Sequence, residues 1–150
     1  MLFPDNREQD DMAGLRATLK LKNTCSELGR IAARVEELAE ERGLPPKTVF
    51  DLHLAIEEHF TNVINHGLDV CAECEVTMNI SMDTDAVVIV IEDPGTPFNP
   101  MAADEPDLTG PAEERKEGGL GLHLIRKVMD EIHYERREDK NVFTMIKRIR

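Results

Sequence analysis

The sequence predicts an α+β domain, a two-layer α/β sandwich in which helices cover one face of a mixed but mainly antiparallel sheet. Several short stretches alternate apolar and polar residues, which is the pattern of strands with one solvent-exposed face. Three longer stretches repeat apolar residues at helical spacing. The resulting order, β-α-α-β-β-loop-α-β-β, joins neighbouring strands by hairpins rather than by crossovers, and hairpins produce antiparallel pairs.

The chain is expected to begin its fold with a strand and a helix. Leucines and an alanine alternate with polar residues over residues 15–21, as in a strand with one buried face. Thr24 and Glu27 then have the spacing of a capping box, and apolar residues at helical spacing follow over residues 28–39. This first helix should end at Gly43.

A second helix is expected after Pro45 and Pro46, which interrupt the preceding pattern. Its apolar positions recur every three or four residues, and Gly67 should end it. The positions expected to be buried are Val49, Leu52, Ile56, Phe60 and Val63.

Two strands and a loop follow this helix. Alternating apolar residues predict a strand over residues 74–82, and a β-branched run predicts another over residues 86–91. Residues 83–85, Asp-Thr-Asp, are typical of a turn, so the two strands should pair as an antiparallel hairpin. The polar, proline-rich segment from about residue 98 to residue 116 is expected to be a mobile loop.

The last elements expected are a helix and a hairpin. Apolar residues at helical spacing run from Leu120 to Ile132, behind a Gly-Gly-Leu-Gly sequence. Residues 132–136 and 142–149 have the pattern of two strands joined around residues 138–141.

Composition is that of an ordinary globular domain and argues against two classes of partner. The 150 residues suit one domain, and 41% of them are hydrophobic. With 18 Lys and Arg against 30 Asp and Glu, the formal net charge is −12. Nucleic acids and anionic membranes attract clustered positive charge, so neither is expected as a partner. We expect a cytoplasmic protein, because the sequence shows neither a membrane span nor the features of a secretory signal.

Three cysteines do not predict a disulfide framework in a chain of this size. Cys71 and Cys74 form a C-x-x-C pair, but no second pair of metal-ligating residues with suitable spacing accompanies it. We therefore expect buried or half-buried thiols rather than a zinc site.

Glu58 and Asn62 are four residues apart on the second predicted helix, which stacks a carboxylate and a carboxamide on one face. The apolar stripe of the helix points elsewhere, so this face is free for polar chemistry. A carboxamide oxygen suits Mg²⁺, and a carboxylate can orient a hydroxyl and accept its proton. Taken alone, the pair is also consistent with an ordinary solvated helix face.

Asp93 and Gly95 directly follow a buried β-branched strand. A carboxylate at a strand end can accept a hydrogen bond from an exocyclic amine, and a glycine lets the backbone approach a planar ring. Asp-Pro-Gly is equally a common turn sequence, and in isolation a turn is the default interpretation.

The sequence Gly118-Gly119-Leu120-Gly121 opens the third predicted helix. Free backbone N–H groups and the positive end of the helix dipole meet there, which favours an anion such as a phosphate. No Lys-Ser or Lys-Thr follows, as in a Walker loop, and Leu124 stands at the third glycine position of a dinucleotide fingerprint. A plain hinge is the alternative interpretation.

Together, and in this order along the chain, the three motifs resemble the nucleotide-binding boxes of the GHKL ATPase superfamily, whose domains share the Bergerat fold. The likeness is greatest to the anti-sigma factor serine kinases of the RsbW and SpoIIAB type, and it extends from about Leu15 to Lys147. The stretches that resemble the three boxes are Glu58-His59-Phe60-Thr61-Asn62-Val63-Ile64-Asn65-His66-Gly67, Asp93-Pro94-Gly95-Thr96-Pro97-Phe98-Asn99-Pro100 and Gly118-Gly119-Leu120-Gly121-Leu122.

The resemblance implies an ATP site. Asn62 would hold a Mg²⁺ that bridges the phosphates, Asp93 would bind the adenine amino group, and Gly95 would let the ring approach. The glycine stretch Gly118-Gly119-Leu120-Gly121 would wrap the phosphates. Thr144, on the last strand, would place a hydroxyl near Asp93 or the nucleotide.

The resemblance also implies phosphoryl transfer. Glu58 would act as the general base, accepting the proton of a partner's serine while the serine oxygen attacks the γ-phosphate. Lys116 is the basic residue nearest the glycines, where family members often have an arginine. It would lie near the charge of the transferred phosphoryl group, but its ammonium is a point charge, whereas an arginine guanidinium is a planar fork.

In this interpretation, residues 1–14 are an N-terminal extension, and residues 15–150 form the ATP-binding kinase domain with a lid at about residues 98–118. The implied function is an anti-sigma factor serine/threonine kinase that binds a sigma factor and phosphorylates a serine of a small, STAS-type anti-anti-sigma protein. A homodimer is implied as well. The alternative is a nucleotide-sensing interaction module that switches partners without phosphorylating them, and a third hypothesis is a detached sensor histidine kinase domain.

Residues outside these motifs are given plainer roles. His59 is expected at the periphery of the domain. The basic residues Lys147, Arg148 and Arg150 are expected at a solvated edge.

Overall fold

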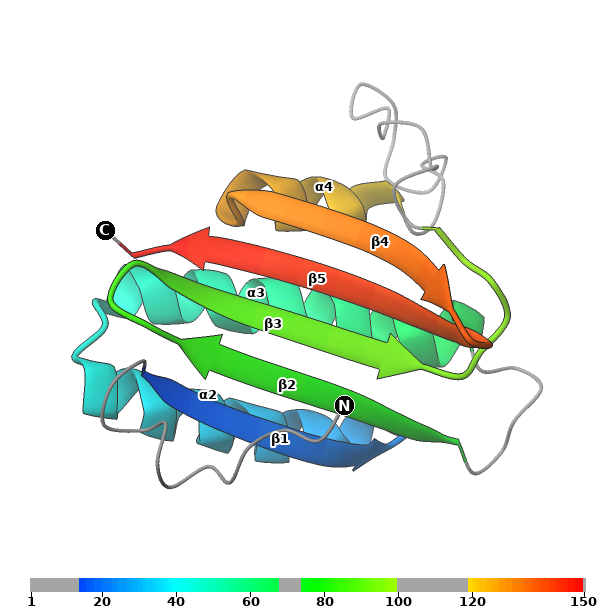
Figure 1. Ribbon diagram of the computed structural model, residues 1–150, viewed down its shortest axis with the longest axis horizontal. Helices are drawn as coiled ribbons and strands as arrows, with labels where there is room; N and C mark the ends of the chain where they lie inside the picture. Colours follow the sequence, from blue (N-terminus) through cyan, green and yellow to red (C-terminus); the bar gives the residue numbers. More distant parts are fainter. Residues whose placement is uncertain (1–13, 68–73, 100–118, 150) are drawn as a thin grey trace.

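A five-stranded sheet and three α-helices make up the computed structural model, which describes residues 14–67, 74–99 and 119–149 (Figure 1). The predicted order of strands and helices is confirmed. The elements are β1 (Leu15–Lys22), the 3₁₀ turn η1 (Cys25–Glu27), α2 (Leu28–Arg42), α3 (Pro46–Asn62), the π-helical turn η2 (Val63–Gly67), β2 (Glu75–Met82), β3 (Ala86–Asp93), α4 (Gly119–Val128), β4 (Glu131–Arg137) and β5 (Lys140–Arg148).

The strands are ordered β1-β2-β3-β5-β4. Every pairing between these five strands is antiparallel, so the sheet is not mixed as the sequence suggested. The reason lies in the placement of β5. Strand β4 runs in the same direction as β3, but β5 lies between them and pairs antiparallel with both. Sequence order alone does not reveal this insertion.

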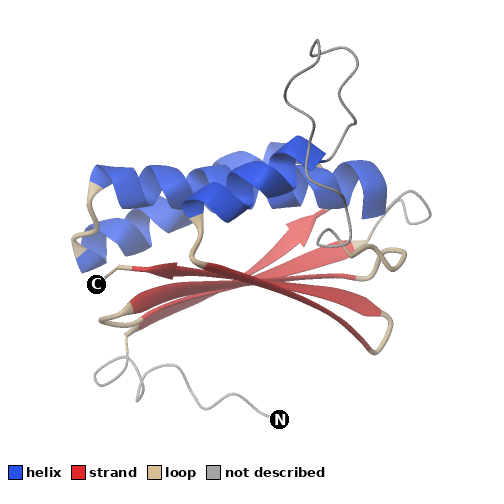
Figure 2. Cartoon of the chain, turned by 90° about the horizontal axis from the view of Figure 1, so that it is seen from above, coloured by secondary structure: helices blue, strands red, loops and turns tan. Residues whose placement is uncertain are grey.

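The helices all lie on one side of the sheet, as predicted, and the core fills the space between the two layers (Figure 2). Strand residues alternate between the two faces. On β3, for example, Val87, Ile89, Ile91 and Asp93 are buried, and the residues between them are partly exposed. The largest fully buried side chains include Phe60 of α3 and Phe143 of β5. This alternation decides which strand residues face α3.

The start of the first helix differs from the predicted capping box. Thr24 makes no side-chain cap hydrogen bond, and its hydroxyl lies 2.7 Å from that of Ser26. The Glu27 carboxylate instead accepts a hydrogen bond of 3.0 Å from the Lys22 N–H. A turn of 3₁₀ helix occupies the expected first helical turn, so Glu27 is moved toward the end of β1. Gly43 ends α2 as predicted, with a φ of 66° that favours glycine.

Helix α3 begins with a proline in its first turn and runs to Asn62, where the backbone changes to the π-helical turn η2 that ends at Gly67. Proline is well suited to the first turn because its missing N–H has no helical partner there. A π-helical turn rotates the following side chains relative to a regular α-helix, and such turns are frequent at functional sites. Here the change occurs directly after Asn62.

A two-residue turn at Glu138 and Asp139, with φ values of 48° and 65°, joins β4 to β5. Positive φ at both positions is the geometry of a type I′ hairpin turn. The turn fixes the register of β4 and β5, in which Asn141 pairs with Arg136. On its other side, β5 pairs with β3 so that Asn141 lies opposite Asp93.

Two further expectations are wrong. Lys147 is not part of a solvated edge: only 18% of its side chain is exposed, and Nζ lies 3.1 Å from Oδ2 of the buried Asp51. It also donates a hydrogen bond of 2.7 Å to the Val128 carbonyl, which stabilises the end of α4.

Cys74 is disulfide-bonded rather than a thiol, while Cys25 is free and exposed. None of the helices in the described ranges is long and apolar enough to span a membrane.

Candidate nucleotide site

A small pocket lies where the C-terminal part of α3 faces the ends of β3 and β5. Its volume is about 10 Å³, which is about the space of one water-sized sphere. It brings together Asn62 and Asp93, which are 31 positions apart in sequence and were both predicted as site residues. The lining residues are His59, Asn62, Val63, Asp93, Phe98, Tyr134, Asn141 and Phe143.

Asp93 is the last residue of β3 and is only 3% exposed. Its Oδ1 accepts hydrogen bonds from the Gly95 N–H at 3.0 Å and from Asn141 Nδ2 at 3.1 Å. Burial raises the pKa of this carboxyl, and the two hydrogen bonds and the Arg136 charge oppose the shift. Since both hydrogen bonds are made to Oδ1, Oδ2 keeps its capacity to accept a hydrogen bond from a ligand.

Asn141 holds this end of the site together, and it is not among the site residues predicted from the sequence. Its Nδ2 also donates to the Thr96 carbonyl at 2.8 Å. Its Oδ1 accepts hydrogen bonds from the Tyr134 hydroxyl at 2.6 Å and from the Phe98 N–H at 3.2 Å. The side chain is 4% exposed. A two-residue turn before β5 sets only the pairing of Asn141 with Arg136 on β4. Its position opposite Asp93 depends on the pairing of β5 with β3, for which the sequence held no local signal.

His59 lies in the interior of the domain, so its predicted peripheral position is wrong. The side chain is 4% exposed, and its ring stacks on Phe143 with centroids 3.9 Å apart and planes 14° from parallel. Neither ring nitrogen has a hydrogen-bond partner among the described residues. Burial lowers the pKa of His59 to about 3, so the imidazole is neutral at physiological pH.

Asn62 and Glu58 lie one turn apart on α3, as predicted, but only Asn62 lines the pocket. Glu58 is half-buried, and its side chain forms no hydrogen bond or ion pair with the residues that the structure describes. Its neighbour Glu57 is exposed. The carboxylate of Glu58 is therefore available to a group that approaches α3 from outside the pocket.

Gly95 is buried beneath Asp93, and both of its backbone polar groups are hydrogen-bonded. Its N–H donates to Asp93, and its carbonyl accepts a hydrogen bond of 2.8 Å from Arg136 Nη1. Gly119, Leu120 and Gly121 form the first turn of α4, which packs beside α3. Gly118, Lys116 and positions 100–118 of the predicted lid lie outside the described residues.

Thr144 does not lie near Asp93, and this prediction is wrong. It pairs with Val90 on β3 and lines a groove of about 430 Å³ on the face of the sheet away from the helices. Asp93 and Asn141 point to the opposite, helix-covered face. Side chains alternate between the two faces along a strand, and Thr144 is three residues after Asn141. The two side chains therefore lie on opposite faces of the sheet.

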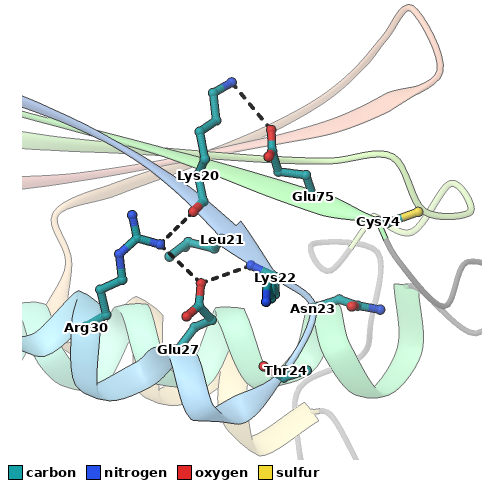
Figure 3. A pocket seen from close by; sticks show the side chains of 9 residues that line it. All are labelled: Lys20, Leu21, Lys22, Asn23, Thr24, Glu27, Arg30, Cys74 and Glu75. Atoms are coloured by element: carbon teal, nitrogen blue, oxygen red, sulfur yellow. Dashed lines mark hydrogen bonds and ion pairs between the residues drawn. The ribbon is translucent and has the colours of Figure 1, made fainter.

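A larger cleft of about 520 Å³ lies at the end of β1 beside η1 and the start of α2 (Figure 3). Four of its five charged side chains form ion pairs with one another. Lys20 Nζ lies 3.8 Å from a Glu75 carboxylate oxygen, and Arg30 Nη1 lies 3.3 Å from Glu27 Oε2. Arg30 also donates to the Lys20 carbonyl at 2.7 Å. Among its charged side chains, Lys20, Glu27, Arg30 and Glu75 are already paired within the protein, so the cleft is assigned no ligand.

The residues of the small pocket suit a flat, neutral ring that carries an amino group. Val63, Phe98 and Phe143 give it apolar walls, and Asp93 can accept the amino hydrogen. No group of three or more His, Cys, Asp or Glu side chains among the described residues could hold a metal ion. A Mg²⁺ at Asn62 would therefore take its other ligands from phosphates and water, as Mg²⁺ usually does in phosphoryl-transfer sites. The pocket admits a base only if its lining opens, and Phe98, at 38% exposure, is the most exposed of the lining residues.

Comparison with known proteins identifies relatives over most of the chain. The family model for the histidine kinase-like ATPase domain matches residues 21–147. The serine-protein kinase RsbW of Halalkalibacterium halodurans is 32% identical over 121 residues, which cover 77% of this chain and 71% of that protein. The serine/threonine-protein kinase BtrW of Bordetella bronchiseptica is 25% identical over 134 residues, which cover 89% of this chain and 94% of that protein.

Solved structures show the same fold. The chain is similar to the structure of the RsbU and RsbW domains of a Mycobacterium tuberculosis protein, with a TM-score of 0.62 and 17% identity, over 90% of this chain and 32% of that one. It is also similar to the histidine kinase domain of a blue-light activated kinase of Erythrobacter litoralis, with a TM-score of 0.55 and 18% identity, over 96% and 70% of the two chains. The chain belongs to the histidine kinase-like ATPase family, within the group of RsbW-type anti-sigma factor kinases.

Proposed function

We propose that the protein is an ATP- and Mg²⁺-dependent serine kinase that binds a sigma factor and phosphorylates a serine of a small, STAS-type anti-anti-sigma protein. The observation that best supports this proposal is the meeting of Asn62 and Asp93 in one pocket, with Glu58 one helical turn from Asn62. Membership of a group whose named relatives are serine-protein kinases supports the same chemistry.

In this proposal, the base of ATP enters the pocket between α3 and the ends of β3 and β5. Asp93 Oδ2 accepts a hydrogen from the adenine amino group, while Oδ1 remains bonded to Gly95 and Asn141. Burial strengthens this hydrogen bond because water competes weakly for the carboxylate. The buried Gly95 backbone keeps the space beside the ring free of a side chain.

The phosphates leave the pocket past Asn62 toward the start of α4. We propose that Asn62 holds Mg²⁺ through its carboxamide oxygen. The ion would supply charge neutralisation for the β- and γ-phosphates. Backbone N–H groups of the stretch from Gly118 to Gly121 would contact phosphate oxygens, because the first N–H groups of a helix have no intrahelical partner. Lys116 would supply a further positive charge.

Glu58 would act as the general base. It would accept the proton of the acceptor serine while the serine oxygen forms a bond to the γ-phosphorus and the bond from that phosphorus to the β-phosphate oxygen breaks. ADP and a phosphoserine result. Glu58 suits this role because it is bound to no other described side chain and lies one turn from the proposed phosphate position. We further propose that the kinase acts as a homodimer.

The test uses Glu58→Gln, with Glu57→Gln as the matched control on the exposed neighbour. ATP binding is measured by calorimetry with Mg²⁺, and transfer of labelled phosphate is measured with STAS-type proteins of the same cell as acceptors. Glu58→Gln should bind ATP within about twofold of the wild type and lose phosphoryl transfer by about 10²- to 10⁴-fold, which is the usual contribution of a general base. Glu57→Gln should retain both properties.

Three results would contradict parts of the proposal. Transfer by Glu58→Gln at the wild-type rate would remove Glu58 from its role. The wild type could instead bind ATP and recover a sigma factor in a nucleotide-dependent way, yet transfer phosphate to no STAS-type protein. That result would favour the non-catalytic interaction module. The lysine in place of arginine at position 116 also favours this module. A wild-type protein that binds no ATP would overturn the proposal as a whole.

A further inference from the structure

His59 is a buried polar group that the proposed function does not use. Its ring is fixed in orientation by the stack on Phe143, and both nitrogens are without partners among the described residues. It lines the same pocket as Asp93. A neutral imidazole has one donor and one acceptor, and native proteins rarely leave such groups unbonded in the interior. An unpaired buried histidine inside a candidate ligand pocket therefore indicates a ligand.

We propose that His59 is a specificity-determining residue for the purine base, donating a ring N–H to one of the two ring nitrogens that flank the amino group bound by Asp93. The inference rests on the proposed binding of ATP. Adenine offers acceptor nitrogens, N1 and N7, on either side of its amino group, so one edge of the base can satisfy both residues. Asp93 would recognise the amino group, and His59 would recognise the adjacent acceptor.

The surroundings of His59 favour a base over an anion. The imidazole is neutral, and the carboxylate of Asp93 in the same pocket repels a phosphate. Val63 and Phe98 add apolar surface of the kind that packs against an aromatic ring. A phosphate site would need positive charge, and among the residues that line this pocket none is a lysine or an arginine.

The same geometry predicts discrimination against guanine. Guanine presents a carbonyl oxygen where adenine presents its amino group, and this oxygen would face the Asp93 carboxylate. Its N1 also carries a hydrogen, so it cannot accept a hydrogen bond there. A site whose buried polar groups are left unpaired by the wrong base rejects that base strongly. With His59 on N1, the pair of Asp93 and His59 would therefore select adenine nucleotides by two adjacent contacts. With His59 on N7, which accepts a hydrogen bond in both bases, Asp93 alone would select adenine.

The test variant is His59→Phe, which keeps an aromatic ring against Phe143 and removes both nitrogens. The control is His53→Phe on the same helix, where His53 Nε2 lies 3.5 Å from Glu36 and outside this pocket. Binding of ADP, 1-deaza-ADP and 7-deaza-ADP to each full-length protein is measured by calorimetry. His59→Leu is a second variant, used if the larger phenyl ring prevents folding.

For the wild type, one of the two deaza compounds should bind about tenfold more weakly than ADP, a loss that corresponds to one net hydrogen bond. For His59→Phe, ADP itself should bind about tenfold more weakly, and that deaza compound should show no further loss. His53→Phe should behave as the wild type. Because an unpaired polar group is removed, the melting temperature of ligand-free His59→Phe should equal or exceed that of the wild type.

The outcomes separate this inference from the proposed function. A wild type that binds no ADP overturns the proposed function and the inference together. If the wild type binds ADP and His59→Phe binds it equally well, the role of His59 alone is overturned. The same conclusion follows if His59→Phe loses the same affinity for ADP, 1-deaza-ADP and 7-deaza-ADP. A lower melting temperature of the ligand-free variant, with unchanged base discrimination, would assign His59 to packing rather than to recognition.

Discussion

The pocket at Asp93 and the cleft at Arg30 differ in size, charge and hydrogen bonding. The cleft is about 520 Å³ and the pocket about 10 Å³. In the cleft, Lys20 and Arg30 are paired with exposed or partly exposed carboxylates (Figure 3). In the pocket, a carboxylate is 3% exposed, and a neighbouring histidine has no partner for either nitrogen within the described ranges of the chain.

We infer from this comparison that unmet hydrogen-bonding capacity, rather than volume, marks the proposed ligand site. A paired charge on the surface contributes little and has nothing further to offer a ligand. A buried polar group without a partner costs free energy in the ligand-free protein, and a ligand that supplies the partner recovers it. Three predictions test this difference, beginning with the largest expected effect.

The first concerns the network around Asn141. Replacing Asn141 by alanine removes the partners of Asp93, Thr96 and Tyr134 in a buried region. We expect the free energy of unfolding to fall by about 3 kcal/mol, since each buried polar group left unpaired costs roughly 1–3 kcal/mol. Urea denaturation measures this loss.

The matched control for Asn141→Ala is Asn79→Ala on the open face of the sheet. Asn79 Oδ1 accepts one exposed hydrogen bond of 2.7 Å from Thr18. Its loss should cost less than about 0.5 kcal/mol, as for other surface substitutions. Equal losses for the two variants would contradict the view that burial makes the Asn141 network important.

The second prediction is a pH dependence due to His59. Its pKa is lowered from 6.5 to about 3 in the folded protein, so between these values the unfolded chain binds a proton that the folded chain does not. Stability is therefore lost as the pH falls through this window, by up to about 1.4 kcal/mol per pH unit. Between pH 6 and pH 4, we expect the wild type to lose about 2.5 kcal/mol more stability than His59→Phe.

Asp93 acts in the opposite sense in the same acid range. Its pKa is raised, so the folded protein binds the proton more tightly, and this term adds stability as the pH falls toward the ordinary value. The term is shared by the wild type and His59→Phe, and the difference between their denaturation curves isolates His59. Parallel curves at all pH values would show that His59 is not buried in its neutral form.

The third and smallest effect is expected in the cleft. Arg30→Met removes the pair with Glu27 and the bond to the Lys20 carbonyl, but Glu27 keeps its bond from the Lys22 N–H. The loss of stability should stay below about 1 kcal/mol and shrink with added salt, as for exposed ion pairs. ATP affinity should not change. A large fall in ATP affinity would indicate that ATP binds at the cleft, and it would contradict the inference drawn from comparing the two regions.

Much of the fold could be predicted because it depends on local patterns. Period-two alternation located the strands, helical spacing located the helices, and Gly43 ended its helix as expected. The predictions for Asn62 and Asp93 rested on local motifs, and the fold brings both side chains into one pocket. The errors were made where position across the sheet mattered. Thr144 was placed near Asp93, while Asn141 was left in a turn and His59 at the surface.

By itself, the sequence determined the elements, their order, the helix-covered face and the two motif residues, Asn62 and Asp93, that meet in one pocket. It could do so because hydrophobic periodicity and glycine or proline placement act over a few neighbouring residues. The tertiary structure decided that β5 lies between β3 and β4, and that Asn141 rather than Thr144 faces Asp93. It also decided that His59 stacks on Phe143, with no hydrogen-bond partner in the part of the chain that the structure describes. These features depend on strand register and on burial, and both are fixed only when segments distant in sequence pack together.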